Sequence, residues 1–150
     1  MNDLTETNIN SPTSDDKLLS LLCHLSSFLG GIILPIIIWA TQKDKSKFVR
    51  FHSLQAIFFH ISVAVIIIIL VIVFLIIIFA GIGFSSIDKF NSQDNFPPFM
   101  IFIMIIFYGG IFVIVFTFFV YSVYLAVKAY KGELIRIPFI GNIIFEKVYR

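Results

Sequence analysis

Three stretches of the chain carry no charged side chain, and their lengths limit what the chain can fold into. They cover residues 18–42, 51–87 and 95–127 and hold 25, 37 and 33 residues. About 20 residues of helix cross the roughly 30 Å hydrocarbon core of a bilayer. Two crossings joined by a turn need more than about 40 residues, so each stretch has room for one crossing. We therefore predict three membrane spans.

Composition points to lipid as the surrounding solvent. Hydrophobic residues make up 59% of the chain and charged residues 13%, whereas soluble domains have about 25% charged residues. The run 63–78 is apolar on every side, while a barrel strand would alternate apolar and polar residues. Because lipid offers no hydrogen-bond partner to the backbone, these β-branched residues are expected to form helix.

We predict an all-α membrane protein built as a bundle of three long transmembrane helices. A disordered acidic tail, 1–16, is expected to precede a single membrane domain, 17–150. That domain ends in a short amphipathic cytoplasmic tail, 128–150. The expected spans are 18–41, 52–84 and 97–127.

The basic residues indicate an orientation. Nine of the eleven fall in the loop after the first span or in the tail after the third, and only Lys17 and Lys89 do not. With three crossings these two segments share a side, so the positive-inside rule places them in the cytoplasm. We expect an integral membrane protein with the N-terminus outside and the C-terminus cytoplasmic. The apolar stretch 134–145 is too short to span and is expected to lie along the cytoplasmic interface, against anionic head groups.

The spans contain no Asp, Glu, Lys or Arg, which argues against an ion-coupled transporter acting alone. If the first two spans are continuous antiparallel helices, His24 and His60 reach similar depths and can form a hydrogen bond, whereas His52 cannot join them. A metal site needs three or four ligands, and no carboxylate is available, so neither a metal nor a cofactor is expected.

Two features of the first span suggest its packing. Ser26 with Gly30, and Ser27 with Gly31, form small-xxx-small spacings, which fit internal packing, self-association or coincidence. Pro35 predicts a kink, because proline lacks the N–H that a helix interior needs.

No catalytic or phosphate-binding motif is present in the sequence, so an enzyme is not expected. The lone Cys23 lies in an apolar run, which favours a buried hydrophobic role. The net charge of +2 gives no reason to expect a nucleic-acid partner.

The segment from His24 to His60 is the most distinctive part of the chain. Its pattern LLCHLS, PIIIW and KDKSKFVRFHSLQA, followed by KGELIRIPFIGNII, resembles the Tic-twenty-like family, the bacterial relatives of a chloroplast inner-envelope protein-import component. The resemblance implies a small multi-spanning helical protein of the bacterial cytoplasmic membrane. The candidate motif or partner-contact residues are His24, Pro35, Trp39, Ser46, Phe48, Arg50, His52, Gln55, His60, Gly132, Arg136 and Pro138.

Physical roles can be given to part of this pattern. Ser46 is expected to cap the second helix, which places Phe48, His52, Gln55 and Phe59 on one face. His52 and Gln55 could then hydrogen-bond the tail at 136–139. This face is either a folding and topology motif or a surface that binds a partner.

We therefore expect a non-enzymatic multi-pass subunit or scaffold that acts through partner proteins, with protein translocation or insertion as its process. A small oligomeric transporter or channel is the alternative. The expected partners are membrane lipid and either other membrane proteins or further copies of the chain.

Overall fold

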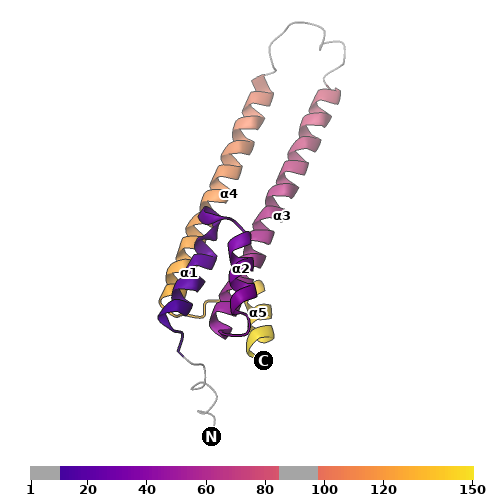
Figure 1. Ribbon diagram of the computed structural model, residues 1–150. Helices are drawn as coiled ribbons and strands as arrows, with labels where there is room; N and C mark the ends of the chain where they lie inside the picture. The colour runs from indigo at the N-terminus through magenta and orange to yellow at the C-terminus, as the bar shows by residue number, and fades with distance from the viewer. Residues whose placement is uncertain (1–10, 85–97) are drawn as a thin grey trace. The chain divides into compact units, whose positions relative to one another are not determined.

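The computed structural model describes residues 11–84 and 98–150, except for the side chains of 27–29, 81–84 and 98–100. All the regular structure in these residues is helical (Figure 1). The helices are α1 (Ser14–Leu29), α2 (Ile33–Gln42), α3 (Lys47–Phe84), α4 (Pro98–Tyr130) and α5 (Ile140–Tyr149). The predicted all-α class is confirmed.

Two of these helices can cross a membrane by length and composition. They are Lys47–Ala80, with 34 residues, and Ile101–Tyr130, with 30 residues. At 1.5 Å per residue, both exceed the roughly 30 Å of hydrocarbon. They correspond to the predicted spans 52–84 and 97–127, although residue 97 lies outside the described residues.

The predicted first span, 18–41, is not one helix. It is divided at Gly30 and Gly31, whose φ angles are +145° and +57°. Helical backbone requires negative φ, and glycine adopts positive values without a steric penalty. The chain folds back there, and α1 and α2 lie side by side (Figure 1). With 16 and 10 residues, neither helix reaches the roughly 20 needed to span, so the expected bundle of three long helices is not observed.

The same turn corrects two expectations about the first span. Pro35 is the third residue of α2, in the first turn, where a backbone N–H has no partner within the helix, so it causes no kink in a continuous span. A Cβ added to Gly30 or Gly31 would meet no atom within 4 Å, so the glycines end a helix and admit no close neighbour. The side chain of Ser27 lies outside the described set.

The start of α1 lies inside the predicted N-terminal tail, 1–16. Thr13 caps the helix: its hydroxyl accepts from Asp16 N at 3.1 Å, and its own N–H donates to the Asp16 carboxylate at 3.0 Å. This reciprocal capping box satisfies two backbone donors. Residues 14–16 are therefore helical, whereas residues 1–10 of the expected tail lie outside the described residues.

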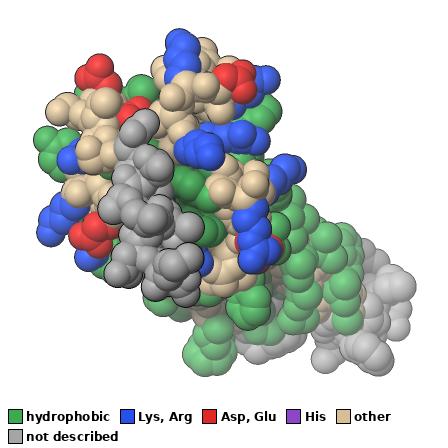
Figure 2. All heavy atoms as spheres, turned by 90° about the horizontal axis from the view of Figure 1, so that it is seen from below, with side chains coloured by type: hydrophobic (Ala, Val, Ile, Leu, Met, Phe, Trp, Pro, Cys, Tyr) green, Lys and Arg blue, Asp and Glu red, His purple; other side chains and the backbone are tan. Residues whose placement is uncertain are grey.

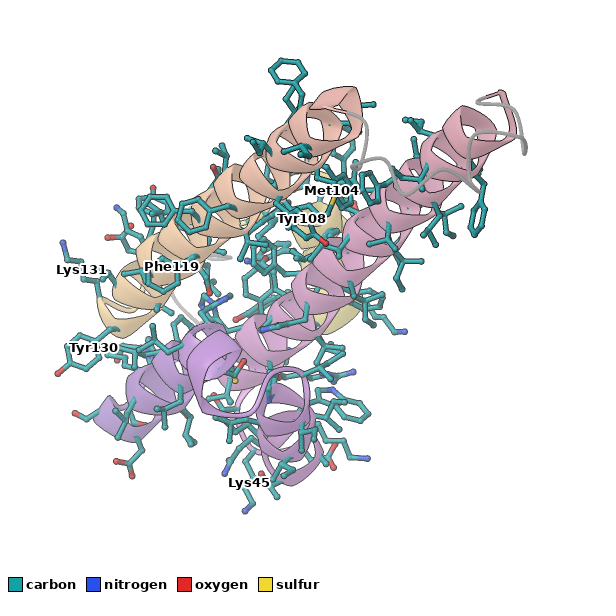
Figure 3. The ribbon with its side chains drawn as sticks, turned by 90° about the horizontal axis from the view of Figure 1, so that it is seen from above. Lys45, Met104, Tyr108, Phe119, Tyr130 and Lys131 are labelled. Atoms are coloured by element: carbon teal, nitrogen blue, oxygen red, sulfur yellow. The ribbon has the colours of Figure 1, made fainter. Side chains whose placement is uncertain are left out.

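The described chain divides into two compact units. The middle unit, 62–118, holds the apolar middle of α3 and most of α4. Phe74 stacks on Phe107 with ring centroids 3.8 Å apart, and Met104 and Tyr108 lie on the side of α4 that faces α3 (Figure 3). Most other side chains of this unit are apolar and exposed, as expected for helices that face lipid.

The terminal unit comprises residues up to 61 and from 119 onward. One apolar core joins α1, α2 and α3 through Cys23, Ile38, Val49 and Ala56. A second core joins α3 and α5 through Phe51, Ile144 and Val148. Helices from the first and last parts of the described chain therefore contribute to one packed body.

The turn between α1 and α2 leads to a stability prediction. Replacing Gly31 with alanine forces a side chain into positive φ, so Gly31→Ala should lower the free energy of unfolding by about 1–2 kcal/mol, measured by denaturation in detergent micelles. Gly109→Ala is the matched control, since its Cβ would also meet nothing within 4 Å, but in a helix interior. The control substitution should leave the free energy of unfolding unchanged or raise it. An equal loss of stability in both variants would show that the positive φ at Gly31 is not the cause.

Candidate functional site

Buried polar side chains gather inside the terminal unit. They are contributed by α1, the beginning of α3 and the end of α4, and each is at most 1% exposed. We call this set the polar cluster: Ser20, His24, Ser26, His52, Ser53, Gln55 and Ser122. Buried polar groups are costly unless they find partners, so their contacts indicate what the cluster does.

The centre of the cluster is a contact between two histidines. His24 Nε2 and His52 Nδ1 are 3.2 Å apart, and the two rings are nearly perpendicular. One nitrogen must donate its hydrogen and the other must accept it, so the contact requires at least one neutral ring. The His52 ring also packs against Phe48 and Phe51, with centroids 4.5 and 5.2 Å away. The pair thus joins α1 to α3 in an aromatic environment.

The predicted pair of His24 with His60 is wrong, as is the exclusion of His52. The depth estimate assumed a continuous first span, whereas the turn at Gly30 places His24 beside the first turns of α3. His60 contacts other groups: its Nδ1 donates to the Ala56 carbonyl at 2.7 Å, and its Nε2 lies 3.5 Å from Ser26 Oγ. Ser26 in turn donates to the Cys23 carbonyl at 2.7 Å.

A serine of α4 adds the third helix to the cluster. Ser122 Oγ donates to the backbone carbonyl of His24. Around it, Leu125, Ala126 and Ala129 are buried, so this side of α4 packs closely in the terminal unit. Ser122 was not among the predicted site residues. It is the only serine of α4, and a small hydroxyl in an apolar helix needs a partner, which was the available signal.

The predicted face of α3 is buried and binds the tail. Ser46 Oγ accepts from Val49 N at 3.3 Å, as expected of the cap, and Phe48, His52, Gln55 and Phe59 are all buried. Gln55 Nε2 donates to the Ile135 carbonyl at 3.0 Å, one residue before the predicted stretch 136–139. His52 Nδ1 makes its hydrogen bond with His24, and the backbone of Glu133, in the tail, lies close enough to interact with the His52 ring.

The tail is held by close backbone approaches. Gly132 has φ +83°, and a Cβ there would lie 3.1 Å from Lys17 Cε. A Cβ on Gly141 would lie 2.6 Å from Arg136 Cα, so only glycine fits. The Arg136 guanidinium lies over the Phe145 ring, 3.6 Å from its centroid. Gly132 and Arg136, both predicted site residues, thus help to fold the tail.

Three further predicted residues lie at the edge of the terminal unit. Lys43 is 5.6 Å from the centroid of the Trp39 ring, a cation–π contact beside the α2–α3 turn. Arg50 Nε is buried without a hydrogen-bond partner. Pro138 is exposed and immediately precedes Phe139, the residue at the start of α5.

The chemistry of the cluster is limited to imidazole, hydroxyl and carboxamide groups. Among residues 11–84 and 98–150, no group of three or more His, Cys, Asp or Glu side chains could hold a metal ion. His24 Nδ1, Gln55 Oε1 and Ser20 Oγ have no direct hydrogen-bond partner. The hydrogen bonds of the cluster connect α1, α3, α4 and the tail.

A comparison with protein families identifies the family of the chain. The model of the MamF/MmsF family, described as the magnetosome magnetite crystal formation protein family, matches residues 15–144. The chain belongs to this family. No curated protein and no solved structure matches it.

Membership of the MamF/MmsF family corrects the resemblance to the Tic-twenty-like family, which was wrong. The process inferred from that resemblance, protein translocation or insertion, loses its support. The match runs from the first turn of α1 to Ile144 in α5. It therefore includes the whole polar cluster and both apolar helices.

The histidine contact in this MamF/MmsF protein can be measured by a double-mutant cycle. His24→Leu and His52→Leu should show a coupling energy of about 0.6–2 kcal/mol for unfolding in detergent, since each removes the same hydrogen bond. The matched cycle pairs His24→Leu with His60→Leu and should give a smaller coupling. Strict additivity in the first cycle would rule out the His24–His52 bond.

Proposed function

We propose that this chain is a non-enzymatic integral membrane protein that takes part in magnetite crystal formation, in the membrane of the magnetosome. The observation that carries the proposal is the family match over residues 15–144, together with two helices that can span a membrane. The role in magnetite formation comes from the description of the family.

The contacts of the polar cluster support a structural role rather than a catalytic one. His24 contacts His52, Gln55 binds a backbone carbonyl of the tail, and Ser122 binds a backbone carbonyl of α1. Each contact joins one segment of the terminal unit to another. We infer that the cluster sets the arrangement of these segments and that the protein acts through its surfaces.

We also propose a topology with two crossings and both chain ends on one side. Lys17 in α1 and Gly132 after α4 lie next to each other, so α1 and the tail after α4 meet in the terminal unit. Ten of the eleven basic residues belong to that unit, the exception being Lys89. By the positive-inside rule this side is cytoplasmic. The earlier expectation of an external N-terminus depended on a third crossing.

Within this topology, α1 and α2 form a hairpin that enters and leaves the membrane on the cytoplasmic side. The hairpin contains no charge from Leu18 to Gln42, and α2 exposes Ile33, Ile36 and Ile37. At 1.5 Å per residue, α2 is about 15 Å long, half of the hydrocarbon thickness. Exposed isoleucines on a helix of this length fit lipid contact within one leaflet.

Reporter fusions test the topology. A reporter at either end of the full chain should be cytoplasmic, since two crossings return the chain to its starting side. A fusion after Phe84 leaves only one crossing and should place the reporter on the opposite side. An external reporter at the N-terminus alone would support three crossings and overturn this arrangement.

Magnetite precipitation inside vesicles tests the function. Vesicles that hold the protein and mixed ferrous and ferric iron should yield crystals with a different mean size and a narrower size distribution than protein-free vesicles, as measured by electron microscopy. The double variant Gly30→Ala/Gly31→Ala, inserted at the same number of molecules per vesicle, should not change the crystal size, because it disrupts the terminal unit. Identical size distributions with and without the protein would refute the proposal.

The same vesicles distinguish the scaffold from a small channel. Ferrous iron added outside is followed by an enclosed chelating dye. We expect the protein to leave the rate of iron entry unchanged, because the two candidate spans carry no charged side chain between residues 51 and 80 or between 101 and 127. Iron entry that rises in proportion to the protein would favour an oligomeric transporter instead.

A further inference from the structure

The C-terminal helix α5 uses only one of its sides for packing within the chain. Gly141, Ile144 and Val148 are buried, and the latter two contact Phe51 of α3. The stretch 134–145 was expected to lie along the cytoplasmic interface; of its apolar residues, Ile144 is covered by protein.

A different side of α5 remains uncovered and has a mixed apolar and basic character. Phe139 is 87% exposed and Ile143 is 70% exposed, and they are four residues apart. Lys147 follows after four more, and Arg150 lies on the same side at 100° per residue. We call Phe139, Ile143, Lys147 and Arg150 the exposed flank of α5.

The backbone at Phe139 determines how its ring is presented. It has φ +64° and ψ −61°, the only positive φ of a non-glycine residue in the described chain. This is a costly conformation for an aromatic residue. Its exposed side chain gains little contact with the rest of the protein in return. The Ile140 N–H donates to the Pro138 carbonyl at 2.8 Å, so a tight turn at the start of α5 sets this backbone and leaves the aromatic ring pointing outward.

We propose that the exposed flank of α5 lies in the head-group layer of the membrane and binds anionic phospholipid. Helix α5 packs on Phe51, in the second turn of a candidate span, and so lies where that span meets water. At such a boundary the rings and aliphatic chains reach the acyl region, and Lys147 and Arg150 reach the phosphates.

The charges around the flank match this ligand. Glu146 is the acidic group beside it, and its ion pair with Arg150 is long, at 3.7 Å, and solvent-exposed. Such a pair is weak, so Arg150 stays available to a phosphate. Lys and Arg side chains gather over this end of the terminal unit (Figure 2). Clusters of basic residues next to a span favour anionic over zwitterionic lipids.

Site-specific fluorescence tests the proposal on the full chain. With the single native cysteine removed by Cys23→Ala, an environment-sensitive dye is attached to Ile143→Cys. The matched control is Asn142→Cys, one residue away and 100° around the helix, on a polar side. In vesicles of phosphatidylcholine and phosphatidylglycerol, the dye at 143 should emit at shorter wavelength and be about twofold less quenched by iodide than the dye at 142.

Two further variants separate lipid binding from folding. Lys147→Gln/Arg150→Gln should abolish the difference between vesicles with and without phosphatidylglycerol. Phe139→Gly relieves the positive φ, so the protein should unfold no more easily in detergent while the dye at 143 becomes more accessible to iodide.

Other occupants of the flank predict different results. Equal quenching at 142 and 143 in vesicles would overturn the proposal. So would a shift that depends on protein density and not on lipid charge, since that result indicates a second copy of the chain. The proposal requires membrane insertion but no iron, so a negative magnetite experiment would leave it standing.

Discussion

The fold-back of α1 on α2 determines how the rest of the terminal unit is assembled. Without positive φ at Gly30 and Gly31, residues 18–41 would form one helix, and His24 would lie far from the start of α3. With the turn, His24 reaches His52, and the core residues Cys23 and Ile38 come together. Lys17 lies beside Gly132, so α1 and the tail after α4 are packed together.

Apolar packing alone would not position these helices uniquely. Isoleucine-rich helices can slide against one another at small cost, since lipid is as apolar as their side chains. Hydrogen bonds have fixed directions and short ranges, and each buried donor that loses its acceptor is costly. The contacts from His24 to His52, from Ser122 to α1 and from Gln55 to the tail therefore define one register among many.

Parts of this structure could be predicted from sequence because they depend on strong, local physical rules. Long uncharged runs must be helical in lipid, which predicts α3 and α4. A serine before a basic, aromatic helix start predicts the cap at Ser46, and the spacing of His52 and Gln55 predicts a buried polar face. An amide in an apolar setting needs a hydrogen-bond partner, and this need predicted the contact of that face with the tail.

The rest could not be predicted, because the same residues fit more than one structure. Gly30 and Gly31 with their serine partners are equally compatible with a packed continuous helix and with a helix end, and only the backbone φ distinguishes them. The His24–His60 pair was wrong because it depended on that choice. In α5, composition indicated an amphipathic helix but not which side would meet Phe51. The family was misassigned because apolar spans and a basic turn are features that many membrane proteins share.

The terminal unit also has a consequence for biosynthesis. Its members are far apart in the sequence: Ser122 binds the backbone of a residue 98 positions earlier, and Gln55 binds one 80 positions later. Helices form within a span as it is made, but these long-range contacts must wait for the last helices. Until the tail has been synthesised, the Gln55 amide lacks its acceptor, the Ile135 carbonyl. Completion of the tail is therefore the step that converts a set of inserted helices into a folded protein.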